Sequence, residues 1–162
     1  MRKIDTLRAA ILDALPELNR DPDRLRMWIE KGSGQATGTQ SEGLAFAFQL
    51  NVLVVELASD IAVLGLAVVR WMRVNQPDLL VPGTTGFDFD ADILDNGTAD
   101  VHLQLQLDQA VSATPLAGGK YKLEYRSEPD PLFEDGLGII AEQQAPRLAG
   151  YTVVEDLPPW EV

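Results

Sequence analysis

Cysteine is absent from this chain of 162 residues, and long apolar stretches are scarce. Without cysteine there are no disulfides, no thiolate metal ligands and no cysteine nucleophile. The longest apolar stretch, Ile61 to Val69, is too short to span a bilayer and is typical of a buried core helix. Asp5 and Asp13 interrupt the apolar residues of the N-terminal segment, which therefore lacks the apolar core of a secretory signal.

Basic residues are scarce in most of the chain. The formal net charge is −12, and residues 32–162 contain six basic and nineteen acidic side chains, whereas residues 1–31 contain seven and six. Such an acidic surface repels nucleic acid and anionic lipid at long range. We therefore expect neither direct, sequence-specific nucleic-acid binding nor a membrane partner. An acidic wall beside moving DNA would instead keep the DNA from adhering.

Motifs for catalysis and metal binding are also missing. Asp88, Asp90 and Asp92 resemble the start of a calcium loop, but Ile93 stands where that loop needs glycine. On a strand, the three carboxylates would form a row with a spacing of about 6.6 Å instead of converging on one cation. His102, the only histidine, falls on the polar face of a predicted strand. No serine lies in a nucleophile motif, so we expect no enzyme activity, no cofactor and no metal site.

Two amphipathic or apolar segments predict helices. The first runs from about Thr6 to Leu15, with apolar residues three and four apart and Asp5 or Thr6 as its N-cap. The second follows Ser59 as N-cap and ends near Asn75, before a proline. Because it is apolar almost all round, we expect the sheet and a second element to cover it.

The segments between and after these helices predict strands. Residues 24–31 and 87–94 alternate in polarity, residues 44–57 are apolar on both faces in their second half, and residues 99–108 alternate without error. The polar segment 32–43 predicts a long hairpin loop. Residues 95–98 contain Asn-Gly, which suits a type I′ turn, and residues 120–126 predict an edge strand.

This pattern predicts an α+β fold with a mostly antiparallel sheet of four to five strands, packed by two main helices. We expect a single domain over residues 1–126 and an irregular extension rich in proline and acidic residues over 127–162. Long loops are often functional, so segment 32–43 is a candidate interaction arm. Trp71 has two interpretations, packing against the sheet and anchoring a partner.

Several segments, in this order, resemble the phage tail completion protein R (GpR) family of contractile-tailed temperate phages. The segments are ATGT at 36–39, LNVLVVE at 50–56, W-x-x-x-NQPDLL at 71–80, GFDFDADILDN at 86–96 and the alternating strand that ends in LQLD at 105–108. The resemblance covers roughly Ile4 to Val111. We recognise no counterpart in the family for the residues after Val111.

The resemblance implies a structural protein of the virion, assembled in the host cytoplasm and needed late in tail assembly. Such a protein acts at the head-proximal end of the tail and permits heads and tails to join. The layout is similar to that of tail terminator proteins, which implies a homo-oligomer and specifically a hexameric ring. Its partners would be copies of itself, the tail tube or sheath protein, and neck or connector proteins.

Two hypotheses assign residues to these contacts. If DNA passes through a ring, Asp88, Asp90 and Asp92 would face the channel. The loop 32–43 would contact the tail tube or a neighbouring subunit through the residues Thr37, Gly38, Gln40 and Ser41.

Three alternatives remain open at this point. One is a neck or connector protein on the head side, and another is a small acidic hydrolase with a carboxylate pair. The third is a bacterial scaffold protein unrelated to virions.

Overall fold

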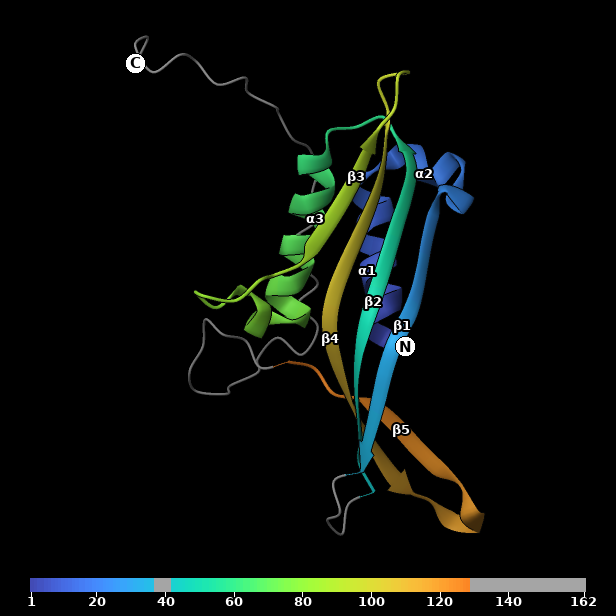
Figure 1. The fold of residues 1–162 in the computed structure, drawn as a ribbon. Coiled ribbons are helices and arrows are strands. Elements are labelled where there is room, and N and C mark those ends of the chain that lie inside the picture. The colour runs from blue at the N-terminus through green and yellow to red at the C-terminus, as the bar shows by residue number, and fades with distance from the viewer. Residues whose placement is uncertain (37–41, 129–162) are drawn as a thin grey trace.

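The structure, a computed structural model, describes residues 1–36 and 42–128. Its helices pack on an antiparallel sheet in an α+β arrangement, as the sequence predicted (Figure 1). In chain order they are α1 (Arg2–Ala14), α2 (Pro16–Arg20), the 3₁₀ turn η1 (Pro22–Arg24), β1 (Leu25–Ala36), β2 (Leu44–Leu57), α3 (Ile61–Asn75), η2 (Pro77–Leu80), β3 (Asp88–Ile93), β4 (Ala99–Pro115), η3 (Ala117–Gly119) and β5 (Tyr121–Tyr125).

The five strands form one antiparallel sheet in the order β1-β2-β4-β3, and β5 also pairs with β4. Val111 of β4 pairs with Leu44 of β2 and also with Tyr125 of β5. Since β2 occupies one side of Val111, β5 lies on the other, the same edge of β4 to which β3 pairs. The two short strands therefore follow one another along one edge of the long strand β4.

Helices α1 and α3 pack on one face of this sheet and against each other (Figure 1). The core forms where the apolar stripe of α1, including Leu7 and Ile11, meets the alternate apolar residues of β2 and β4 and the inner face of α3. β2 lies between β1 and β4, as expected of a central strand, and its residues from Val52 to Val55 are apolar on both faces. The sheet and α1 cover α3, but Leu66 on its outer side stays exposed.

Both predicted helices exist, but their N-terminal ends differ from the prediction. α1 begins at Arg2, so neither Asp5 nor Thr6 caps it, and a short second helix follows from Pro16. For α3 the N-cap is Asp60, whose carboxylate accepts a hydrogen bond from the Ala62 amide at 2.7 Å. Ser59 is engaged elsewhere, because its hydroxyl donates to Glu17 at 2.9 Å.

The predicted loop 32–43 is too long, because its first part belongs to β1. Gly32 pairs with Phe48 and Gly34 pairs with Phe46. The side chains of Phe48 and Phe46 lie beside these two glycines, at a distance that a Cβ atom would meet as ordinary van der Waals contact. Only the pattern of polar and small residues had indicated a loop, and backbone pairing does not require apolar side chains in both strands.

The predicted hairpin of β3 and β4 is confirmed, but its turn is not of type I′. Gly97 has a φ of 79°, whereas Asn96 has no positive φ. The Gly97 amide donates to the Leu94 carbonyl, and the Leu94 amide donates to the Thr98 carbonyl. This is a type I turn followed by a left-handed glycine, the usual form of a three-residue hairpin loop.

Candidate interaction surfaces

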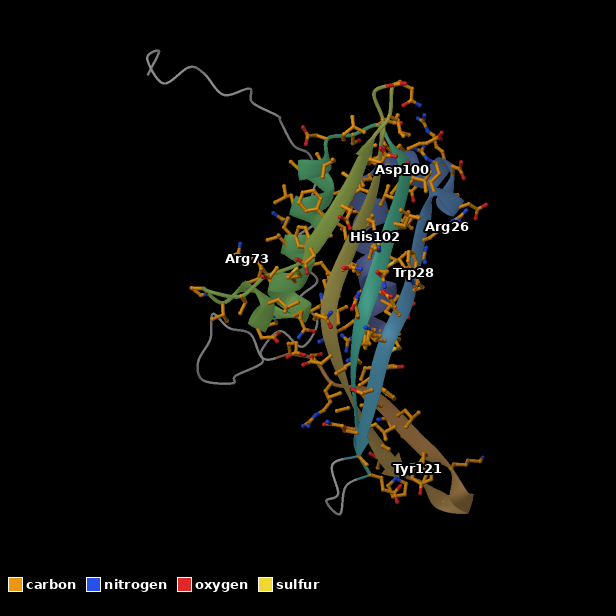
Figure 2. All side chains as sticks on the ribbon, viewed as in Figure 1. Arg26, Trp28, Arg73, Asp100, His102 and Tyr121 are labelled. Carbon is orange, nitrogen blue, oxygen red and sulfur yellow. The ribbon has the colours of Figure 1, made fainter. Side chains whose placement is uncertain are left out.

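The sheet face opposite α1 and α3 has no helix over it in the described ranges and is mainly polar (Figure 2). Because partners in an antiparallel register share a face, the open face can be followed across the strands. One row contains Arg26, Leu53, His102 and Asp90, one from each of β1, β2, β4 and β3. We call this surface the open face.

A hydrogen-bonded network occupies the middle of the open face. Asn51 is buried, and its side-chain oxygen lies 2.8 Å from His102 Nε2, while its amide donates to Glu30 at 3.3 Å. The Trp28 and His102 rings stack in parallel, with centroids 5.7 Å apart. Trp28 is nevertheless 43% exposed. A flat aromatic surface, held in place by neighbouring polar groups, therefore faces outward beside the acidic residues of β3.

The three aspartates Asp88, Asp90 and Asp92 form an exposed row along β3, which we call the acidic row. They share the open face with Gln104, His102 and Asp100 of β4, and Asp90 lies 3.9 Å from His102 Nδ1. In the described ranges, no group of histidine, aspartate and glutamate side chains has an arrangement that could hold a metal ion. The row is thus a line of separate negative charges on an edge strand.

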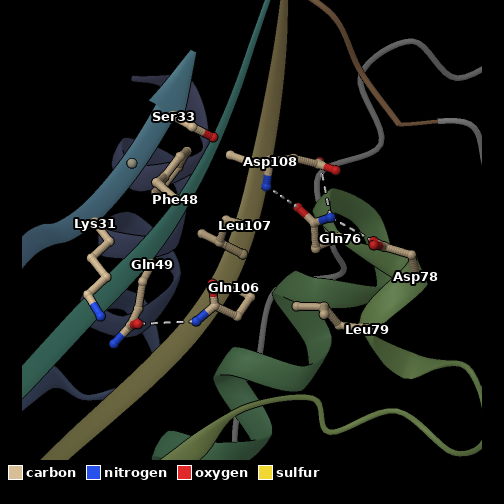
Figure 3. Close-up of a pocket in the computed structure, with 12 residues that line it drawn as sticks. Lys31, Ser33, Phe48, Gln49, Gln76, Asp78, Leu79, Gln106, Leu107 and Asp108 are labelled. Atoms are coloured by element: carbon tan, nitrogen blue, oxygen red, sulfur yellow. Dashed lines mark hydrogen bonds between the residues drawn. The ribbon is translucent and has the colours of Figure 1, made fainter. Parts of the chain in front are cut away.

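A shallow hollow of about 670 Å³ lies beside the part of β4 that β3 does not reach (Figure 3). Lys31, Gln49 and Gln106 line it from the sheet, and the Gln49 and Gln106 side chains are hydrogen-bonded at 3.3 Å. On the other side, Gln76 bonds to the backbone amide and the carboxylate of Asp108. Hydrogen bonds between side chains therefore connect the residues along both walls of the hollow.

The end of β4 and β5 form a two-stranded arm, residues 111–125, that extends past the helices (Figure 1). On one face of the arm β5 carries the exposed apolar side chains of Tyr121, Leu123 and Tyr125, with Leu123 exposed to 62%. Lys122 and Glu124 lie on the other face and form a salt bridge at 2.8 Å. Exposed apolar residues concentrated on one projecting element are typical of a surface that a partner covers.

Charged residues at the start of α1 hold the base of this arm. Arg2 donates to the Tyr125 carbonyl at 3.4 Å and to the Ser127 hydroxyl at 3.3 Å. Lys3 is only 3% exposed, and its ammonium lies 2.8 Å from both the Glu128 carboxylate and the Gln76 side-chain oxygen. An isolated two-stranded hairpin is marginally stable, so these contacts fix the direction in which the arm leaves the sheet.

The tip of the arm also touches the end of the β1–β2 connection. The Tyr121 hydroxyl donates a hydrogen bond to the Glu42 carboxylate. This bond, together with the negative charge of Glu42, raises the pKa of Tyr121 above its ordinary value, because both favour the neutral phenol. The arm and the β1–β2 hairpin therefore form one end of the molecule.

Of the remaining predicted interaction residues, four lie outside the described residues, and Trp71 is buried. Thr37, Gly38, Gln40 and Ser41 lie outside the described residues, as does the extension from residue 129. Trp71 is 2% exposed and donates a hydrogen bond to Thr6 of α1 at 3.0 Å, so it packs in the core and is not part of an exposed surface.

Sequence reasoning missed the Trp28–His102 stack, the Lys3 contacts and the projection of the arm from the sheet. For the arm a signal existed, the apolar alternation of Tyr121, Leu123 and Tyr125. For Lys3 there was none. No helix in the described ranges is long and apolar enough to cross a membrane.

Comparisons with known proteins give consistent results. The family model for P2 phage tail completion protein R (GpR) matches residues 1–129. The chain is also similar to "Tail completion protein R" of Escherichia phage P2, with 33% identity over 134 residues, which cover 81% of this chain and 86% of that protein. No solved structure matches significantly. The family match continues past Val111 and includes the arm, which corrects the shorter extent expected from the sequence.

Proposed function

Because this chain belongs to the P2 phage tail completion protein R (GpR) family, we propose that it completes the head-proximal end of a contractile phage tail and permits the head to join. It would do so as a structural protein of the virion, assembled in the bacterial cytoplasm. The observation that carries this proposal is the family match over residues 1–129, which includes every described helix and strand. The match also favours a single domain that ends near residue 129.

A ring of identical subunits is the arrangement that we propose for this role. Its open face, with Asp88, Asp90 and Asp92, would line the channel, and α1 and α3 would lie outside. Two features support this orientation. The helices already cover the other face, and an acidic wall reduces adhesion of passing DNA.

The end of the molecule formed by the arm and the β1–β2 hairpin is the part that we propose to contact the tail tube or sheath. The exposed apolar side chains of the arm support this assignment, as does its place within the family match. Thr37, Gly38, Gln40 and Ser41 lie between β1 and β2 in the sequence and remain our candidates for this contact.

The test is a deletion of the gene in the phage or prophage that encodes it, followed by electron microscopy and infectivity assays. We expect free heads and free tails in place of joined particles, and rescue when the gene is supplied from a plasmid. Gold labelling of a tagged protein on isolated tails should mark one tail end. Label on isolated heads alone would favour a neck or connector protein, and full infectivity without the gene would reject the proposal.

A further inference from the structure

In the described part of the chain, β1, β3 and β5 each have one unpaired edge, and the edges of β1 and β3 bound the four-stranded part of the sheet. β1 pairs only with β2, and β3 pairs only with β4 on the opposite side of the sheet. The outward backbone amides and carbonyls of such strands are templates for pairing with another chain. A protein that needs to stay monomeric usually blocks one or both of these edges.

Although β1 and β3 lie on opposite sides of the sheet, their open edges lie at the same level along the strand direction. Arg26 on β1 and Asp90 on β3 belong to one row across the four strands, and Trp28 and Asp88 belong to the next. β1 is regular from Leu25 to Ile29 and then bulges, and β3 has a similar length of six residues. A neighbouring copy placed beside this one, displaced perpendicular to the strands within the plane of the sheet, would therefore bring the regular part of its β1 against β3.

The side chains of the two edges are complementary on both faces. On the open face β1 carries Arg26, which is exposed, whereas β3 carries the acidic row. On the helix side β1 carries Ile29, and β3 carries Phe89 and Ile93, which are 57% and 69% exposed. Opposite charges would meet on one face and apolar side chains on the other, which is the pattern of paired strands within a sheet.

We propose that β1 of one copy of this chain adds to β3 of the next copy, so that Arg26 lies beside the acidic row of its neighbour. β1 runs parallel to β4 and β3 runs antiparallel to it, so a copy that keeps the same face outward presents β1 antiparallel to β3. Such a head-to-tail contact repeats and closes into a ring when the rotation per copy allows it. This inference rests on the ring proposed above and names its interface.

The spacing of the acidic row makes this contact tolerant of stagger. A closed sheet requires its strands to be staggered, and only shifts by an even number of residues keep each face on its own side. Because Asp88, Asp90 and Asp92 are two residues apart, Arg26 meets a carboxylate in each of three registers that differ by two residues. The acidic row therefore fits a curved interface as well as a flat one.

The opposite role for the acidic row is protection of an edge strand, since charges also prevent unwanted pairing. The two roles predict opposite results for charge reversal. If the row forms the interface, Arg26→Asp or Asp90→Arg should weaken self-association roughly tenfold or more through like-charge contacts, and the double variant should recover it. If the row is protective, Asp90→Arg should strengthen association.

A disulfide experiment tests the contact directly, because the natural chain has no cysteine. Arg26→Cys would be combined in turn with Asp88→Cys, Asp90→Cys and Asp92→Cys. Within one chain the two positions are about 14 Å apart, three strand spacings, and too far for a disulfide. After mild oxidation we expect at least one pair to give a ladder of linked copies on non-reducing gels.

The control pair is Arg26→Cys with Ala91→Cys, whose side chains lie on opposite faces in the proposed registers. It should give no ladder, and each single variant should give at most dimers. Oxidation would be carried out both on purified protein and on tail particles, where mass spectrometry confirms that the protein is present. Absence of a ladder for all three pairs in such particles would overturn this interface and leave tail completion intact. Absence of the protein from complete, infectious tails would instead reject the proposed function.

Discussion

Lys3 joins several parts of the described chain that are far apart in the sequence. Its ammonium contacts Gln76 after α3, Asp108 on β4 and Glu128 after the arm, and its own backbone amide donates to Gln109. A lysine that is almost completely buried is rare unless it is paired. Here each of its three N–H donors has an acceptor, so the charge is held by hydrogen bonds as well as by two carboxylates.

Replacing Lys3 by methionine should therefore destabilise the fold while leaving the volume of the side chain nearly unchanged. We expect a loss of about 1–3 kcal/mol in the free energy of unfolding, because buried acceptors lose their donor. The Asp108 carboxylate is largely exposed, so solvent screens its attraction to Lys3, and this ion pair adds little to the expected loss. Urea denaturation measures the change. Lys120→Met, at an exposed position, is the control and should change stability by less than about 0.5 kcal/mol.

At the scale of single elements, the N-cap of α3 is Asp60 and not the neighbouring Ser59 that the sequence predicted. Both Ser59 and Asp60 are residues that favour N-caps. The choice depends on Glu17 of α2, which accepts hydrogen bonds from the Ser59 hydroxyl and from the Ala58 amide. No local pattern contains this information, because Glu17 is far away in the sequence.

Asp60→Ala should cost about 1 kcal/mol of stability, since the Ala62 amide loses its acceptor. Asp60→Asn retains an oxygen at the same place and should be nearly neutral. Thermal unfolding of the two variants, followed by circular dichroism, compares them directly. Equal stability of the two variants would show that the cap contributes nothing.

We expect the arm to contribute to binding a partner in the tail and little to the stability of the fold. Leu123 is mostly exposed, so Leu123→Ser should change the unfolding free energy by less than about 0.5 kcal/mol. In tails, the same change should reduce incorporation of the protein, because a partner can no longer cover an apolar side chain there. Complementation of the deleted gene measures this effect. Lys122→Ser, on the polar face of the arm, is the matched control.

Element positions were predictable where side-chain periodicity is strong, and less so elsewhere. Val101 to Leu107 alternate strictly, and β4 is found there, although it continues to Pro115. The continuation of β1 through Gly32 and Gly34 was not predictable, because β2 supplies the apolar side chains for both strands. The exposed surfaces were predicted in part. The acidic row follows from alternation, whereas the Trp28–His102 stack requires the register of three strands.

At the scale of the whole molecule, self-association is the property that most directly bears on the proposed ring. Native mass spectrometry over a concentration series should show a dominant species of about 106 kDa, the mass of six copies of the 17.7 kDa chain. The species should lose intensity when Arg26→Asp is introduced. A chain that stays at 17.7 kDa at every concentration would contradict spontaneous ring formation, and any ring would then have to assemble on the tail end.

The sequence alone determined the order of helices and strands, the polarity of each sheet face and the acidic character of the body, because each depends on residues that are close along the chain. The tertiary structure decided which distant residues meet. It placed Lys3 against Glu128, put β3 and β5 on one edge of β4, and left the outer edges of β1 and β3 open on opposite sides of the sheet. These relations depend on strand register and on how the chain crosses the sheet, and local periodicity specifies neither.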